Sequence, residues 1–391
     1  MLRMSWGKTG RAEVIDVPPL PPPIFIARPA ALERLARLLR RETVIAVDTE
    51  SNSLYAYQEQ VCLIQFSTPA YDYLVDPLVL LDLSCLAPVF SDARIEKVFH
   101  AAEYDLICLR RDFGFEFANI FDTMIAARIL GREQVGLGSL LEAEFGLVLD
   151  KRHQRANWGR RPVPPELLSY AQTDTHYLIP LRERLRSELQ EKSFWQLARE
   201  DFERACEFNG RNAENRDEEP WRINGARDLS PQNAAVLKEL CRYRDQAARY
   251  TNRPRFKVMG DHTLLAIAEI CPQDLDQLDE IPGMSAGQVE RHGSEVLAAV
   301  RRGMQGPPLY PPHNRRPDDK FLARLEALRT WRKNTAQAMG VPSDVVLPRD
   351  LMLSLAEVCP GNPGQLAEVM RRVPWRLERF GEQLLDILVK A

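Results

Sequence analysis

The feature that most constrains the fold is an internal repeat in the second half of this 391-residue chain. Residues match, without gaps, others that stand 88 positions further on, and the matched pairs are Leu237/Leu325, Arg244/Arg332, Pro254/Pro342, Leu265/Leu353, Cys271/Cys359 and Gly293/Gly381. Both copies have helical spacing of apolar residues and no strand-like alternation. The repeat predicts two copies of one all-α module, at 228–304 and 319–391, joined by a Pro-rich, semi-rigid linker at 305–318.

The first half has a different pattern. Short β-branched runs at 42–51, 61–68, 71–76 and 96–101, and the start of 117–130, are typical of strands, and the first three follow each other as a meander. Helical spacing is found at 27–42, 103–114, the rest of 117–130, and 164–190, the last expected as one long helix. Residues 1–23 are expected to be irregular, and 193–227 to form a helical linker. The order predicts an α/β domain with a mixed sheet over 24–192.

Composition narrows the class of protein. A net charge of −3 and a pI of about 6.2 do not suggest general nucleic-acid binding. Residues 151–161, KRHQRANWGRR, combine five cations with Trp158 and no acid. Such a run is usually a solvated face, but the aromatic Trp158 strengthens the case for a local nucleic-acid groove. Seven cysteines without a CxxC pair argue against a disulfide framework or a zinc site. With no long apolar run and no secretory signal, we expect a cytoplasmic protein without a membrane span.

Four acids and a tyrosine carry the predicted chemistry. Asp48 and Glu50 are two apart on an otherwise apolar strand, so both carboxylates point to one side. Burying such a pair is costly unless a cation neutralises it. Asp105 follows a strand at the first turn of a helix, and Tyr170 and Asp174, four apart, share one helical face. We therefore expect these five residues to form the active site.

Hard oxygen ligands of this kind suit Mg²⁺ or Mn²⁺ rather than zinc. Two such ions about 4 Å apart are the usual clamp for phosphodiester hydrolysis. Asp48 is expected to bridge them, Glu50 and Asp174 to hold the ion that carries the water, and Asp105 to act partly through water ligands. Tyr170 is a poor general base, because an unperturbed phenol has a pKa near 10. It is therefore expected to orient the attacking water.

Three short motifs resemble those of the DEDD superfamily of exonucleases: VDTE at 47–50, FHAAEYD at 99–105 and YAQTD at 170–174. A tyrosine four residues before the last acid is similar to the tyrosine branch of that superfamily. Followed by two modules that resemble HRDC domains (helicase and RNase D C-terminal), the arrangement resembles the ribonuclease D family. The second copy departs from it, with Gly-Val-Pro at 340–342 where the first has Asn-Arg-Pro at 252–254.

The resemblance implies a ribonuclease-H-like fold, two Mg²⁺ or Mn²⁺ ions, and 3′→5′ trimming of tRNA precursors and other structured RNAs to 5′-mononucleotides. It also implies substrate contacts. Gln65 is expected to face outward and touch the terminal nucleotide, or to be a plain polar strand residue. His100 contacts the 3′-terminal ribose or phosphate, or is structural, and Lys151 contacts phosphate. Trp158 belongs to the same substrate-binding segment.

Rival functions remain open at the level of the sequence. The acids do not distinguish RNA from DNA, so a DNA 3′→5′ exonuclease is one alternative. A catalytically silent RNA-binding scaffold is another, although all four acids and the tyrosine are present. A third is an interaction protein built around the helical repeats. Nothing in the sequence demands a dimer, so a monomer is expected.

Overall fold

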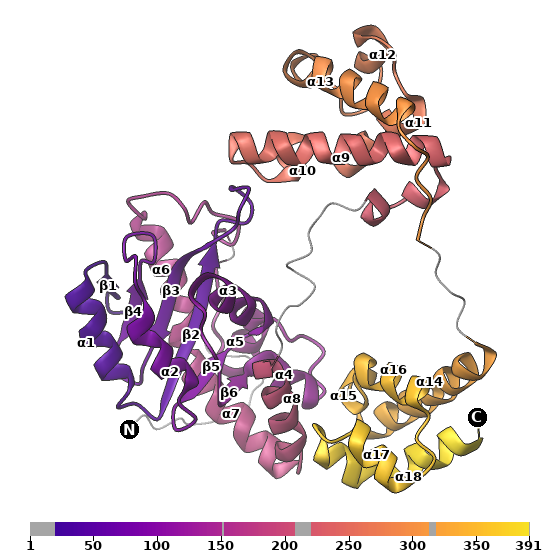
Figure 1. Ribbon diagram of the computed structural model, residues 1–391. Helices are drawn as coiled ribbons and strands as arrows, with labels where there is room; N and C mark the ends of the chain where they lie inside the picture. Colours follow the sequence, from indigo (N-terminus) through magenta and orange to yellow (C-terminus); the bar gives the residue numbers. More distant parts are fainter. Residues whose placement is uncertain (1–19, 151, 208–219, 313–317, 391) are drawn as a thin grey trace. The chain divides into compact units, whose positions relative to one another are not determined.

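The computed structural model describes residues 20–150, 152–207, 220–312 and 318–390 (Figure 1). Six strands form one sheet in the first part of the chain: β1 (Ile24–Ile26), β2 (Val44–Ser51), β3 (Val61–Ser67), β4 (Asp72–Val75), β5 (Glu96–Phe99) and β6 (Ile120–Asp122). Their order across the sheet is β1-β4-β3-β2-β5-β6. β3 and β4 are antiparallel, whereas β1–β4, β2–β5 and β5–β6 are parallel. The predicted mixed sheet and the β2-β3-β4 meander are confirmed; β1 was not predicted.

Helices cover both faces of this sheet. They are α1 (Pro29–Leu39), α2 (Ala87–Ser91), α3 (Glu103–Phe113), α4 (Thr123–Ile129), α5 (Leu137–Phe145), α6 (Pro165–His176), α7 (Leu178–Glu191) and α8 (Trp195–Glu207), with a 3₁₀ turn η1 (Ser84–Leu86). One large core lies among α1–α4, α7, α8 and the sheet. A smaller one, formed by Cys62, Leu63, Leu74, Trp158, Leu167 and Ala171, lies between α6 and the strands β3 and β4.

The expectation of one helix over 164–190 is wrong. The chain leaves the helical ladder at Tyr177, with φ −95° and ψ −1°, and so divides the segment into α6 and α7. Pro180 supplies the reason, because it has no N–H to donate to the carbonyl of His176. The break lets α6 lie over β3 and β4 while α7 packs against α4 and β5.

The first helical module contains η2 (Pro220–Arg222), η3 (Ala226–Asp228), α9 (Pro231–Thr251), α10 (Arg255–Val258), α11 (Asp261–Ile270), α12 (Leu275–Asp279) and α13 (Ala286–Gln305). It has its own apolar core. The segment 51–60, which follows Glu50 in the chain, forms one compact unit with this module. There the Tyr57 hydroxyl donates to Asp245 at 2.7 Å, with the guanidinium groups of Arg249 and Arg255 over its ring.

The second module contains α14 (Asp319–Met339), α15 (Ser343–Val346), α16 (Arg349–Val358), α17 (Pro363–Val369) and α18 (Pro374–Lys390) around a third core. Each of these helices begins 88 residues after its counterpart in the first module, which confirms the repeat. Even the left-handed residues that end α11 and α16 correspond, Cys271 with φ 52° and Cys359 with φ 48°. Among the described residues, no helix is both long enough and apolar enough to cross a bilayer.

Candidate active site

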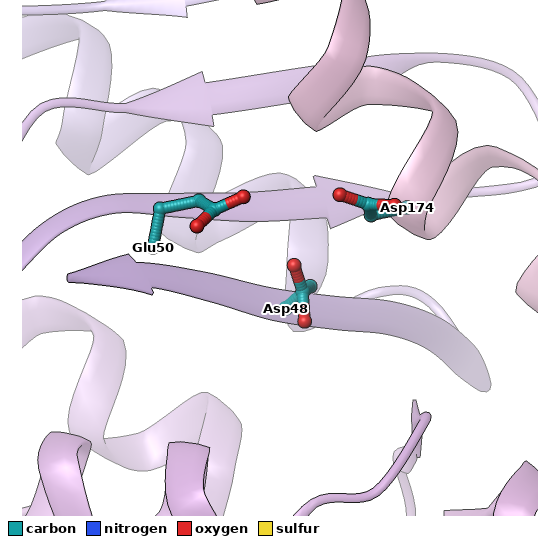
Figure 2. Close-up of side chains that lie close together, drawn as sticks. All are labelled: Asp48, Glu50 and Asp174. Carbon is teal, nitrogen blue, oxygen red and sulfur yellow. The ribbon is translucent and has the colours of Figure 1, made fainter. Parts of the chain in front are cut away.

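Three carboxylates meet where the central strand β2 passes under helix α6. One oxygen from each of Asp48, Glu50 and Asp174 lies within 4.8 Å of the others. Figure 2 shows the three side chains turned toward a common space, two from the strand and one from the helix. The alternation of β2 puts Asp48 and Glu50 on one side, and the packing of α6 over β3 supplies the third acid.

Asp105 comes from a neighbouring element. It lies in the first turn of α3, directly after β5, the strand parallel to β2. Its carboxylate accepts hydrogen bonds from the hydroxyl and the backbone N–H of Thr49, the residue between the two strand acids. Thr49 was not singled out in the sequence, since a threonine in a strand is ordinary. Its position inside the D-x-E motif is the signal that could have identified it.

Burial and mutual repulsion make these acids hard to ionise. Burial, followed by the charge of Asp174, raises the pKa of Asp48 well above its usual value. Burial raises the pKa of Glu50 and Asp105 likewise, with Asp48 the largest charge acting on each. For Asp174 burial raises the pKa to about 7, although the Tyr170 hydroxyl donates to it. A cluster of carboxylates that repel one another and offer only oxygen donors fits divalent metal ions.

Asp122 fastens the turn that leads to Asp105. It caps α4, accepting from the backbone N–H groups of Met124 and Ile125 at 2.8 and 3.1 Å. It also accepts from Ala101 and Ala102, at 3.1 and 2.7 Å, just before α3. Asp122 is therefore the N-cap of α4 and also binds the chain just before α3. By tying β6–α4 to β5–α3, one buried carboxylate fixes the start of the helix that carries Asp105.

Asp48, Glu50 and Asp174 line a pocket of about 490 Å³. Its other walls include His100, Gln154, and the start of α5 at Gly136–Ser139. A hydrogen bond fixes the ring of His100, whose Nδ1 lies 2.9 Å from the hydroxyl of Thr123. Burial lowers the pKa of this imidazole, so the neutral ring is favoured. The start of α5 was missed in the sequence, because its N-cap is Gly136 and not a Ser, Thr, Asp or Asn.

The remaining substrate candidates fare differently. Gln65 does not face outward: every residue of β3 is buried, and neither its amide nitrogen nor its oxygen has a hydrogen-bond partner among the described residues. Trp158 is only 2% exposed and packs in the small core against Tyr170, with ring centroids 6.1 Å apart. Stacking of Trp158 on a base is therefore not supported by its burial. Lys151 lies outside the described residues.

Arg161, at the end of the basic segment, is also occupied within the fold. It donates to both oxygens of the buried Asp76 at 2.7 Å and to the carbonyl of Cys62. Arg152, by contrast, is exposed and pairs with Asp150 at 2.6 Å. Among its described residues, the segment is thus not a continuous solvated face, because Arg161 bonds within the fold and Trp158 packs in the small core beside α6.

Comparisons with known proteins agree with this geometry. Residues 23–190 match the family described as 3′-5′ exonuclease, and residues 233–300 and 321–388 each match the HRDC domain. The chain is 43% identical to the protein RRP6-like 3 of Arabidopsis thaliana over 46% of its own length, but spans only 20% of that relative. It is 29% identical to ribonuclease D of Pseudomonas paraeruginosa, with 94% of this chain and 98% of that one covered.

A solved structure gives the same arrangement. Escherichia coli RNase D, described as an exoribonuclease involved in structured RNA processing, superposes with a TM-score of 0.68 at 26% identity. The superposition covers 94% of this chain and 99% of the other. Taken with the acidic cluster and the two HRDC copies, these likenesses show that the chain belongs to the ribonuclease D family of hydrolytic 3′-5′ exoribonucleases.

Proposed function

We propose that this protein removes nucleotides one at a time from the 3′ end of RNA, by hydrolysis of the terminal phosphodiester to a 5′-mononucleotide. The observation that carries the proposal is the trio Asp48, Glu50 and Asp174, with oxygens within 4.8 Å of one another in a pocket wide enough for a nucleotide. Tyr170 lies beside these three acids, and its hydroxyl donates a hydrogen bond to Asp174. Tyrosine and acids together are more than a binding scaffold requires.

In this proposal Asp48, Glu50 and Asp174, with Asp105 through water ligands, hold two Mg²⁺ or Mn²⁺ ions. Such ions, when bound, polarise the phosphate and lower the pKa of water. The chain's own contribution is to hold two carboxylates on β2, one on α3 and one on α6, with Thr49 bonded to Asp105. The raised pKa values of the acids support this role, since positive charge would relieve their repulsion.

Tyr170 is proposed to orient the attacking water rather than take its proton. Burial, followed by the charges of Asp174 and Glu50, raises the pKa of Tyr170 far above that of a free phenol. The hydroxyl therefore stays protonated at neutral pH and can only donate or share its proton in hydrogen bonds. Its ring is held between Trp158 and His153, with centroids 6.1 and 5.9 Å away. We propose that Trp158 acts by holding this ring.

The substrate is proposed to be RNA with a free 3′ end, tRNA precursors and other structured RNAs among them. The bacterial relative is named ribonuclease D, and the solved neighbour is described as an exoribonuclease involved in structured RNA processing, which supports this class. His100, on the pocket wall, is proposed to contact the terminal ribose or phosphate. Proposed domains are the nuclease at 24–192, the linker at 193–227, and the HRDC-like modules at 228–304 and 319–391, separated by 305–318. We further propose a cytoplasmic monomer.

The decisive test is an exonuclease assay on 5′-labelled RNA and DNA of the same sequence, with Mg²⁺, Mn²⁺ or EDTA. Asp174→Asn and the wild type should have the same circular dichroism spectrum. The proposal expects a ladder that shortens from the 3′ end of RNA, needs metal, and is lost in the variant. Equal or faster cleavage of DNA would favour a DNA exonuclease with the same site. No cleavage by the folded, metal-loaded wild type would leave an RNA-binding scaffold.

A further inference from the structure

The two helical modules have diverged at one corner, where the long first helix meets the short second one. In the first module the corner reads NRPRFK at 252–257; in the second it reads GVPSDV at 340–345. The three cations Arg253, Arg255 and Lys257 are thus replaced by Val341, Ser343 and Val345. One copy keeps a basic corner, and the other has an apolar corner with one acid.

The apolar corner of the second module is packed against the nuclease domain. Val345 is 5% exposed and belongs to the same core cluster as the sheet and α4. At the rim, Asp344 accepts from Arg128 of α4 at 2.5 Å. Gly131, after α4, approaches so closely that a Cβ there would overlap the carbonyl oxygen of Gly340. Each of these contacts uses a residue that distinguishes this corner from its counterpart in the first module.

Arg376 of α18 completes the junction from inside. Its side chain is fully buried, yet its donors have fixed acceptors. Nη1 donates to Glu200 of α8 at 2.9 Å, and Nη2 donates to Asp201 at 2.9 Å and to the carbonyl of Val345 at 2.8 Å. Glu200 also accepts from the backbone N–H groups of Trp375 and Arg376. Two carboxylates of α8 thus hold the start of α18.

In the first module the equivalent position bonds within its own module. Gln288 stands 88 residues before Arg376, and its amide donates to the carbonyl of Val258 at 3.2 Å. Arg376 Nε makes the equivalent bond, to Val346 at 3.2 Å. The common framework needs only this one bond. The longer arginine side chain makes the same bond and also extends to the carboxylates of α8. Docking therefore depends on a residue that only the second copy has.

We propose that the second helical module is an intramolecular brace and not an RNA-gripping module: its corner is occupied by α4 and α8 of the same chain. The part of the proposal that concerns RNA rests on the proposed function; the bracing part does not. The brace holds α4, whose cap Asp122 also fastens the start of α3. RNA contacts outside the active site then fall to the first module.

The junction is tested in the full-length protein with Arg376→Gln, which restores the residue of the first copy. Leaving the buried Glu200 and the partly buried Asp201 without their cation should lower Tm by roughly 5–10 °C and increase cleavage by protease between the nuclease and α14. Arg379→Gln, an exposed position on the same helix, is the matched control and should change neither. Adding Glu200→Gln to Arg376→Gln should recover part of the loss, because one orphaned charge is removed.

A second pair of variants leaves every charge in place. Gly131→Ala and Gly114→Ala impose the same strain, at φ +75° and +69°, but only the former meets a neighbour. Gly131→Ala should lower Tm by several degrees more than Gly114→Ala. Equal effects in this pair, together with equal Tm for Arg376→Gln and Arg379→Gln, would overturn the brace.

The part of the proposal that concerns RNA is tested by measuring the binding of a fluorescent single-stranded RNA by anisotropy in EDTA. Arg376→Gln, held below its Tm, should keep Kd within about twofold of the wild type. A loss of tenfold or more, with the chain still folded, would show that the second module grips RNA and would overturn that part. Failure of the wild type to bind or cleave RNA would instead count against the proposed function, while the stability results would still decide the brace.

Discussion

At the scale of single residues, Asp174 and Tyr170 face the same space but should not matter equally. Asp174→Asn removes a charged metal ligand, so we expect a loss of kcat of at least about 10³-fold. Tyr170→Phe removes only a hydroxyl that stays protonated and orients water, so a loss of roughly 10–10²-fold is expected. Single-turnover cleavage of 5′-labelled RNA at saturating metal measures both. A Tyr170→Phe enzyme as inactive as Asp174→Asn would contradict an orienting role.

Metal binding should depend on pH because the acids hold protons that a cation must displace. With the pKa of Asp174 at about 7 in the metal-free protein, the fraction ionised falls as pH drops below 7. This proton alone should lower the affinity for Mn²⁺ by about tenfold per pH unit below 7, and protons on Asp48 and Glu50, whose pKa values are also raised, should steepen the fall. Calorimetric titrations from pH 5.5 to 8.5 measure this. The same slope in Asp174→Asn would assign the proton to Asp48 or Glu50 instead.

The stability of the metal-free protein should change with pH in the opposite direction to its affinity for metal. Between the usual pKa of an aspartic acid and about 7, folded Asp174 binds more protons than unfolded Asp174, so its contribution to stability falls as pH rises. The difference in Tm between wild type and Asp174→Asn, in EDTA, should therefore grow with pH from 5 to 8, with the variant the more stable. Saturating Mn²⁺ should abolish that advantage.

At the scale of elements, Asp122 joins two helix starts, and its loss should be felt at both. Asp122→Ala removes the acceptor of four backbone N–H groups, so a loss of about 2–3 kcal/mol of stability is expected. Because the turn before Asp105 loosens, kcat should fall as well. Asp318→Ala, which removes the cap of α14 only, is the control and should cost about 1 kcal/mol without changing kcat. Urea unfolding and steady-state kinetics would separate the two.

Features that depend on neighbouring residues in the sequence were predictable. The burial of side chains that depends on a helix packed over them was not. The acids of β2 and the turn of Asp105 follow from alternation and helix position alone. Gln65 was expected outside because a polar strand residue usually is; it lies inside because α6 covers the second face of β3, making that strand central and buried on both sides. Trp158 was misplaced for the same reason: sequence shows its cationic neighbours but not α6 above it.

For the whole molecule, the repeat predicted two copies of one bundle but not that the copies differ in use. Their helices begin at equivalent residues and their cores have equivalent positions, since periodicity encodes both. The corner residues carry no such period. The second copy packs on the nuclease because of three exchanged cations, one buried arginine and a close approach of two glycines. The role of each of these residues can be recognised only when the residue it contacts is known.

The division of labour between modules predicts an unequal salt dependence of RNA binding. In the first module Arg253 and Lys257 are exposed, next to Tyr250 and Phe256, whose side chains are 93% and 57% exposed. Each cation withdrawn from a phosphate of single-stranded RNA should lower the slope of log K against log salt by about 0.7. The double variant Arg253→Gln/Lys257→Gln should therefore have a slope smaller by about 1.4 and bind several-fold more weakly at low salt.

The matched control removes two exposed cations from the second module, Arg329→Gln/Lys333→Gln on α14. That module is proposed to brace the nuclease and not to hold RNA. The salt dependence and the affinity of RNA binding by this double variant should therefore equal those of the wild type. Both double variants change the net charge equally, so a general electrostatic effect would move them together. Anisotropy titrations between about 50 and 300 mM salt, where exposed charges become progressively screened, separate local binding from overall charge. Equal slopes for the two variants would place the RNA contacts outside the corner at 252–257.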